Sequence, residues 1–209
     1  MKKILVVISL LLCGLSTPVS AQNIEKLFLT APELVLPLLE YNSRADLLDY
    51  NSAGMNSGVR NLLSGYSYLP ILSKDYLKLD MTDISTMQIK LLPTDADTVI
   101  CVVNSVRAEV EDSRISFFDK SWNRLPTEQF FNAPGIKDFF RNPDSANIHM
   151  KVCDIYLVSL KLNAVDDSMV AEYTMPGYMS EDAAATITPL LRRLVYRWEN
   201  GRFVLENEL

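Results

Sequence analysis

Three polar residues close together, Asn42, Arg44 and Asp49, are the first group in this sequence whose types could do chemistry. They stand within residues 38–54, LLEYNSRADLLDYNSAG, between two apolar runs. An arginine beside carboxylates can bind an anion or build a polar site. The same residues can belong to the start and the exposed face of a helix. We expect the helix, and we take these three residues as the first place to look for a polar surface.

The elements around this group are expected to be helical. Ser43 and a carboxylate three residues later have the spacing of an N-cap and N3, which predicts a helix start, and Gly54 fits its end. Upstream, Asn23 can cap a first short helix. Residues 30–41 also carry capping-box spacing, but Pro37 lies inside the run, so a kinked or short helix is expected there.

The apolar period changes near residue 59 from helical spacing to alternation over strand lengths. The connections between these runs are too short for parallel crossovers, which need a dozen or more residues. The sequence therefore predicts an antiparallel meander, whose runs are YLPIL, DYLKLDM, STMQIKLL, DTVICVVNSV and SRISFFD.

A second round of helices and strands follows. Residues 127–140 hold two phenylalanine pairs at helix-compatible spacing, and a long hairpin is expected to turn at residues 164–167. Ser180 can cap a short helix. Asn200-Gly201, between alternating apolar residues, is the strongest hairpin signal in the chain.

Helices followed by strands, twice over, predict an α+β fold with short N-terminal helices packed on antiparallel sheet. The length suits one domain over residues 22–209, which two similar halves, 22–126 and 127–209, could make up.

The first 21 residues predict export. Lys2 and Lys3 precede an apolar run too short to span a bilayer, and small residues then lead to Ala21, as in a cleaved signal peptide. A lipoprotein signal with Cys13 lipidated is the rival interpretation, which the bulky residue before Cys13 disfavours. A periplasmic or extracellular location is expected.

Composition excludes several functions. The net charge is −6, and removal of Lys2 and Lys3 makes it −8, so the chain would repel a nucleic-acid backbone. His149 is the one histidine, which excludes a histidine-based metal cluster by count. No glycine-rich phosphate loop occurs, and no cofactor is expected. Carboxylates are the remaining chemical resource, but no spacing favours a particular pair.

Two cysteines and two tryptophans have open interpretations. Cys101 and Cys153 could form a disulfide in an oxidising compartment, or remain buried thiols in apolar strands. Trp122 and Trp198 could be exposed for a sugar or a partner, although closing the edge of a core is the commoner use.

Several phrases together resemble the exported family catalogued as domain of unknown function 3256, from Gram-negative gut and oral anaerobes. They are LLEYNSRADLLDYNSAGM, STMQIKLLP, ISFFDKSWNRLP, YTMPGYM and LRRLVYRWENGRF. The resemblance covers nearly the whole mature chain and implies no active site. We expect a non-enzymatic binding or interaction module of the cell envelope, with an envelope protein or a glycan as partner. The alternative is a carboxylate-dependent hydrolase acting on envelope polymers or glycans.

Overall fold

The structure is a computed structural model that describes residues 23–95, 97–150 and 155–206. The α-helices are α1 (Ile24–Thr30), α2 (Tyr41–Ser52), α3 (Pro143–Met150) and α4 (Glu181–Ile187). Short 3-10 helices span Thr127–Gln129, Ile136–Phe139, Met175–Tyr178 and Thr188–Leu190. The predicted signal peptide lies outside the described residues. None of the described helices combines the length and the hydropathy needed to cross a bilayer.

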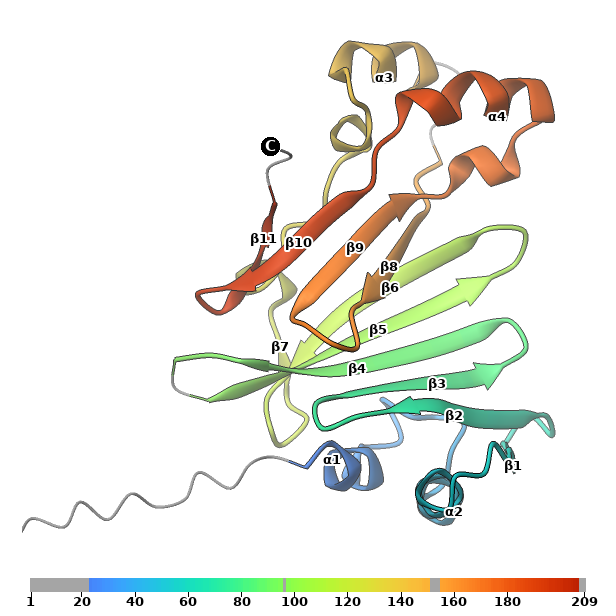
Figure 1. Ribbon diagram of the computed structural model, residues 1–209, viewed down its shortest axis with the longest axis vertical. Coiled ribbons are helices and arrows are strands. Elements are labelled where there is room, and N and C mark those ends of the chain that lie inside the picture. Colours follow the sequence, from blue (N-terminus) through green and yellow to red (C-terminus); the bar gives the residue numbers. More distant parts are fainter. Residues whose placement is uncertain (1–22, 96, 151–154, 207–209) are drawn as a thin grey trace, which may run out of the picture.

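The larger sheet is the predicted meander: its seven strands pair in sequence order, each antiparallel to the next (Figure 1). Apolar residues alternate along the outer strands and run continuously in the central ones, and the tight turns between them fix the register. The strands are β1 (Val59–Arg60), β2 (Tyr66–Leu72), β3 (Tyr76–Thr82), β4 (Ser85–Pro93), β5 (Thr98–Arg107), β6 (Glu111–Phe118) and β7 (Arg124–Leu125).

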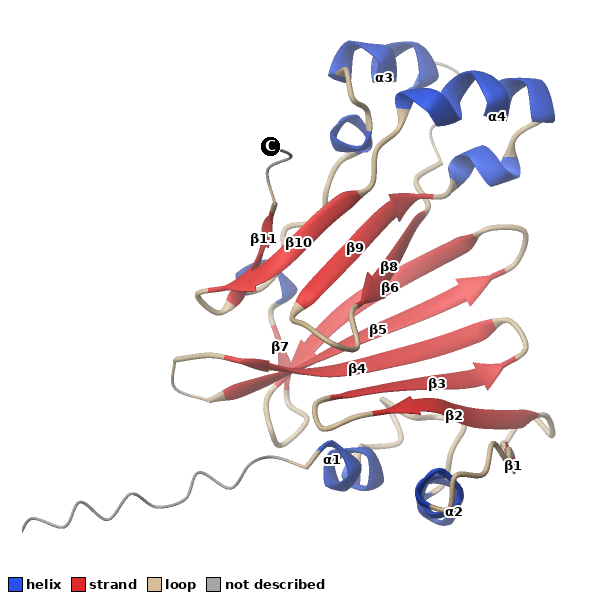
Figure 2. Ribbon diagram, viewed as in Figure 1, coloured by secondary structure: helices blue, strands red, loops and turns tan. Residues whose placement is uncertain are grey.

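The smaller sheet has four antiparallel strands in the order β11-β10-β9-β8 (Figure 2). Asn200 and Gly201 both adopt positive φ, 50° and 77°, as the predicted two-residue hairpin requires. The helical segments α3 and α4 lie beyond one end of this sheet. The strands are β8 (Val158–Leu162), β9 (Ser168–Tyr173), β10 (Leu194–Glu199) and β11 (Arg202–Leu205). An α+β fold with antiparallel sheet is thus confirmed.

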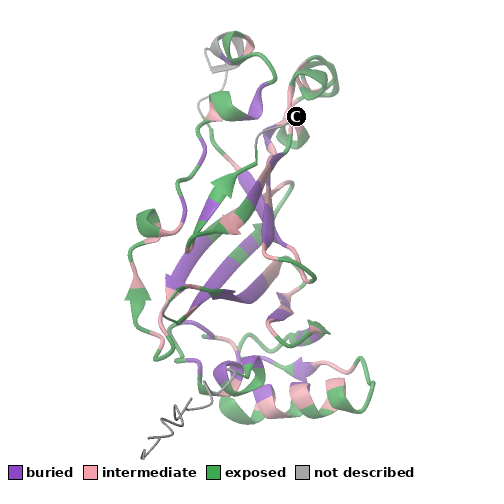
Figure 3. Ribbon diagram, turned by 60° about the vertical axis from the view of Figure 1, so that its left-hand side comes forward, coloured by how far each residue is buried: buried purple, intermediate pink, exposed green. Residues whose placement is uncertain are grey.

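Two apolar cores lie on the two faces of the larger sheet. One face packs on α1 and α2, through side chains that include Phe28, Leu47 and Leu79. The other face packs on the smaller sheet, through side chains that include Phe117 and Met169. Buried residues accordingly gather on the strands, whereas the distal helical segments are mostly exposed (Figure 3). The sheets share one core, although the expected boundary between residues 126 and 127 falls between them.

Gln88, a polar residue of β4, is buried between the two sheets. Its amide nitrogen donates to the carbonyl of Leu160 at 3.2 Å, and its oxygen accepts from the backbone nitrogen of Leu162 at 2.9 Å. The Tyr76 hydroxyl also donates to this oxygen, at 3.2 Å. The side chain therefore satisfies the outer edge of β8 as a neighbouring strand would.

Side chains of β6 complete this capping of the β8 edge. Ser113 Oγ accepts from the backbone nitrogen of Leu160 at 3.0 Å, and Asp112 accepts from that of Val158 at 3.2 Å. An exposed strand edge invites pairing with other chains, and covering it prevents this. The capping also fixes where the small sheet sits on the large one.

Lys90, two residues after Gln88 on the same face, is 1% exposed. Its Nζ lies 3.2 Å from a carboxylate oxygen of Asp75, in the β2–β3 turn, and 3.5 Å from one of Asp167, in the β8–β9 turn. Neither oxygen has hydrogen-bonding geometry to Nζ. The ammonium group therefore connects the turns of the two sheets chiefly by charge.

The predicted helices were only partly correct. Asn23 caps α1 by accepting from the backbone nitrogen of Glu25, as expected. Residues 32–40 form turns rather than a helix, because Pro37 cannot continue one. The helix α2 begins at Tyr41, before the predicted Ser43 start, and its N-cap residue makes no side-chain hydrogen bond.

The phenylalanine-rich segment, whose paired phenylalanines have helix-compatible spacing, is not a continuous helix. It forms two 3-10 helices, at Thr127–Gln129 and Ile136–Phe139, with an extended stretch between them. Pro134 and Gly135 interrupt the helical pattern there, and Pro134 removes a backbone donor. Ser180 precedes α4 as predicted, but its side chain makes no capping bond.

Candidate functional site

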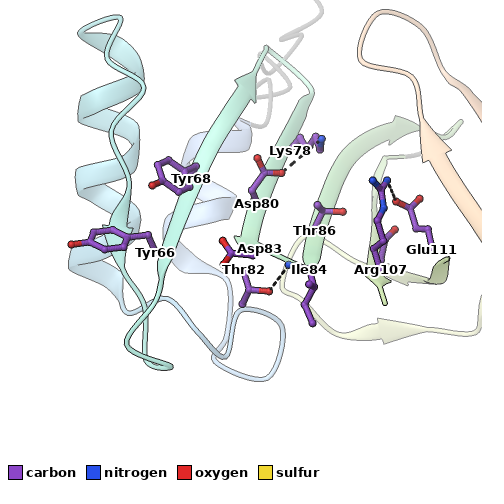
Figure 4. A pocket seen from close by; sticks show the side chains of 11 residues that line it. Tyr66, Tyr68, Lys78, Asp80, Thr82, Asp83, Ile84, Thr86, Arg107 and Glu111 are labelled. Atoms are coloured by element: carbon purple, nitrogen blue, oxygen red, sulfur yellow. Dashed lines mark hydrogen bonds and ion pairs between the residues drawn. The ribbon is translucent and has the colours of Figure 1, made fainter. Parts of the chain in front are cut away.

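A groove of about 410 Å³ lies on the larger sheet, on the face that the smaller sheet covers elsewhere (Figure 4). A second hollow of about 420 Å³ shares its β3–β4 turn, so the groove continues around that turn. The residues lining the groove are Tyr66, Tyr68, Lys78, Asp80, Thr82, Asp83, Ile84, Thr86, Ser105, Arg107 and Glu111.

Strand alternation places these side chains on one face. Lys78, Asp80 and Thr82 alternate along β3 with buried apolar residues that face α1 and α2. Asp80 stands directly opposite Tyr68 in the sheet register, so both point to the same side. Where the smaller sheet covers this face, its side chains form the apolar core between the sheets. The uncovered end of the face carries the polar side chains and is open to solvent.

Two exposed tyrosines form one wall of the groove. Tyr66 is 52% and Tyr68 is 37% exposed, so both rings offer apolar surface to a ligand. A Cβ at Gly58 would lie 2.6 Å from the Tyr68 ring. Only glycine therefore lets the backbone approach this ring so closely.

Four of the five charged residues that line the groove form ion pairs. Lys78 Nζ lies 3.7 Å from Asp80, and Arg107 Nη2 lies 2.9 Å from Glu111 (Figure 4). Glu111 also accepts a hydrogen bond from the Ser159 hydroxyl of β8. Glu111 therefore marks the border where the smaller sheet ends and the open groove begins.

The Glu111 carboxyl stays ionised. Burial alone would raise its pKa, but hydrogen bonds from Ser159 and Arg107 and the charges of Arg107 and Lys161 outweigh burial and hold the pKa below its usual value of 4.5. A general acid needs a raised pKa. Glu111 is therefore suited to accept hydrogen bonds and not to donate a proton at neutral pH.

We expect Glu111→Gln to lower stability in a pH-dependent way. Because the folded pKa is depressed, the contribution of Glu111 is complete above pH 4.5 and is lost as pH falls through the folded value. Chemical denaturation of the wild type and of Glu111→Gln between about pH 3 and about pH 6 should show a difference in the free energy of unfolding that disappears in acid. When Ser159→Ala is also present, Glu111→Gln should cost less stability than it does in the wild type. A loss of stability that is constant with pH would contradict the lowered pKa of Glu111.

The described side chains offer little other reactive chemistry. No three His, Cys, Asp or Glu side chains of the described residues gather closely enough to hold a metal ion. Ser105 Oγ lies 2.7 Å from Ser113 Oγ, and a second serine is no general base. The groove suits recognition of hydroxyls and amides better than bond cleavage.

The structure does not bring Asn42, Arg44 and Asp49 together on one polar surface. Asn42 and Asp49 are exposed on α2, but Arg44 is 6% exposed. The Arg44 guanidinium instead ties α2 to the end of α1. It donates to the backbone carbonyls of Leu39 at 2.8 Å, Phe28 at 3.2 Å, Leu29 at 3.1 Å and Ala31 at 2.5 Å. A cation at these C-terminal carbonyls also complements the helix dipole.

Replacing Arg44 with methionine should destabilise the protein by about 2 kcal/mol, because buried carbonyls lose a charged donor while the apolar stem is kept. Arg44→Lys should recover little, since a lysine lacks the planar fork. Urea denaturation measures both. Arg141→Met, at an exposed position, is the control and should change stability by under about 0.5 kcal/mol. An equal effect at Arg141 would contradict the role of Arg44.

The remaining sequence candidates have separate positions. Cys101 is fully buried in β5, and burial raises the pKa of its thiol. Cys153 lies outside the described residues, as does the side chain of His149, so the disulfide stays a prediction. Trp198 Nε1 donates to the carbonyl of Pro93 at 2.5 Å, and its ring stacks on Phe130 at the edge of the shared core.

Sequence reasoning missed the groove residues. Their signal was present, because Lys78, Asp80 and Thr82 alternate with apolar residues in β3. Such alternation normally marks an ordinary solvent face. The exposed pair Tyr66 and Tyr68, spaced by two on the same face, was the clue that set this face apart.

Comparisons with known proteins give a family and a fold. The family model described as "Protein of unknown function (DUF3256)" matches residues 16–203. A solved structure of a domain of an uncharacterized protein from Porphyromonas gingivalis W83 is similar, with a TM-score of 0.75 and 28% identity. The similarity covers 88% of this chain and 98% of that one. No curated protein matches the chain.

Proposed function

Because this chain belongs to the family described as a protein of unknown function, DUF3256, whose description names no activity, we propose its function from the groove. We propose a non-enzymatic binding module of the cell envelope that holds a glycan segment. The signal-like N-terminal sequence supports export, after cleavage near Ala21.

The observation that carries this proposal is the pairing of exposed tyrosine rings with ion-paired polar groups. Tyr66 and Tyr68 offer flat apolar surface beside Asp80, Arg107 and Glu111. A sugar has apolar C–H faces and a rim of hydroxyls, and each hydroxyl both donates and accepts. Rings with fixed carboxylates and guanidinium groups match both features.

A hydrolase acting on envelope glycans is the second candidate, because Asp80, Asp83 and Glu111 all line the groove. Such a reaction needs one carboxyl as a general acid and a second as base or nucleophile. The lowered pKa of Glu111 argues against it as the acid. Binding without turnover is therefore the better-supported function of the groove.

An array of immobilised bacterial glycans tests the proposal. The wild-type chain should bind a defined set of saccharides, and Tyr66→Ala or Tyr68→Ala should weaken binding at least about tenfold, as loss of an aromatic anchor does. Tyr41→Ala removes a tyrosine that is 59% exposed on α2, which packs on the opposite face of the larger sheet, and should leave binding unchanged. No binding to any saccharide, or equal loss in all three variants, would overturn the proposal.

Turnover separates the two candidates. Bound saccharides should be recovered intact after prolonged incubation with the protein. Release of new reducing ends that Asp80→Asn or Glu111→Gln abolishes would establish the hydrolase instead.

A further inference from the structure

A third hollow, of about 700 Å³, lies on the opposite face of the larger sheet from the groove. It opens beside β6 and β7, past the part of that face that α1 and α2 cover. Its volume is in the range of small-molecule sites. The residues lining it are Thr30, Pro32, Leu34, Val35, Val102, Asn104, Arg114, Ser116, Phe118, Ser121, Trp122, Asn123 and Arg124.

Two exposed arginines, Arg114 and Arg124, line this hollow. Arg124 stands opposite Phe118 in the sheet register, and its Nη2 reaches to 3.5 Å from Ser116 Oγ. Arg114 is the next residue on that face of β6, two positions from Ser116. Arg114, Ser116 and Arg124 thus line the same part of the hollow.

The hollow is positive in an acidic protein. The chain has a net charge of −6, yet no carboxylate is among the described residues that line this hollow. Neither Arg114 nor Arg124 forms an ion pair with a described residue, whereas Arg107 and Arg197 do. Two like charges without a counter-ion favour an anion between them.

The lining of the hollow also includes exposed apolar surface. Leu34 projects with 94% of its surface exposed, beside Pro32 and Val35. Opposite, Trp122 packs edge-on against Phe118 with ring centroids 5.5 Å apart. An exposed leucine and an edge-on pair of aromatic rings beside two arginines are suited to one molecule with an apolar body and an anionic end.

Trp122 carries a further unsatisfied group. Its φ of 63° is unusual for a tryptophan, and its indole Nε1 is buried with no hydrogen-bond acceptor among the described residues. A buried donor without an acceptor is costly.

We propose that this hollow is a binding site for a small amphipathic anion. The oxyanion is held by Arg114 and Arg124, and the apolar body lies between the Pro32–Val35 turn and the ring of Trp122. This site is separate from the glycan groove and stands whether or not the groove binds a glycan.

Two matched fluorescent probes test the site. The compound 8-anilino-1-naphthalenesulfonate has an aromatic body with one fixed negative charge, and N-phenyl-1-naphthylamine has the same rings without the sulfonate. The folded wild-type protein should bind the sulfonate. In Arg114→Gln/Arg124→Gln its affinity should fall at least about tenfold, because two charge-assisted contacts are lost. The affinity for the neutral probe should change by less than about twofold in this variant, since the contacts of that probe are apolar.

The control variant is Lys137→Gln/Arg141→Gln, which removes two exposed cations elsewhere in the chain. It should bind both probes as the wild type does, and thermal melts should show all variants folded. The proposal is overturned if the wild type does not bind the sulfonate. The proposal is equally overturned if the arginine variant binds the sulfonate with unchanged affinity. It is also overturned if the control variant loses as much affinity for the sulfonate as the arginine variant does.

Discussion

Replacing Gln88 with leucine is expected to destabilise the protein by about 4 kcal/mol, among the largest effects of any single substitution. Leucine fills nearly the same space, but it leaves the Leu160 carbonyl and the Leu162 backbone nitrogen without their partners in a buried interface. The Tyr76 hydroxyl loses its acceptor as well. Urea denaturation followed by tryptophan fluorescence measures the change.

Gln129→Leu is the matched control for this prediction. Gln129 is exposed in a 3-10 helix, so the same chemical change there should alter stability by under about 0.5 kcal/mol. Ser113→Ala removes one acceptor from the same β8 edge and should cost about 1 kcal/mol. If Gln88→Leu behaves like Gln129→Leu, the capping of β8 contributes nothing and the account of the sheet interface is wrong.

The second large effect is expected for Asp75→Asn/Asp167→Asn, which should destabilise the protein by about 3 kcal/mol. The double change leaves the Lys90 ammonium buried without either carboxylate that neutralises it. Both aspartates are partly exposed, so the loss comes from the stranded buried cation more than from the aspartates themselves. The same denaturation experiment applies.

Adding Lys90→Met to the double variant should restore most of the lost stability, since replacing a buried ionic group by an apolar one of similar size is often neutral. Asp46→Asn/Asp49→Asn removes two exposed carboxylates from α2 and serves as the control, with little expected change. A failure of Lys90→Met to restore stability would show that the aspartates act independently of Lys90.

Much of the fold could be predicted from local sequence. The strands β2 to β6 follow alternation and short turns, and Asn200-Gly201 specified the last hairpin. The helical errors have a common cause, because Pro37 and Pro134-Gly135 stand inside otherwise helical patterns. Pro37 was expected to kink or shorten a helix and instead prevents one, and Pro134-Gly135 interrupts the helix-compatible spacing of the phenylalanines.

The candidate site was less predictable, because its character depends on which part of one sheet face is covered. In STMQIKLLP, Gln88 and Lys90 alternate with apolar residues and so resemble a solvent face. Burial of both depends on the smaller sheet, which starts some 70 residues later at Val158. Arg44 likewise resembled a surface residue, and three of its four carbonyl partners come from the end of a different helix.

Binding of a glycan in the groove without turnover is the central claim, and one NMR titration tests it most directly. A saccharide selected on the array is added to isotope-labelled protein, and protein amides and sugar anomeric protons are followed in the same sample. We predict shifts at Tyr66, Tyr68 and Arg107, smaller changes on β9 to β11, and no new anomeric signals from the sugar over time. Shifts confined to the smaller sheet, or new anomeric signals that appear with time, would contradict the claim.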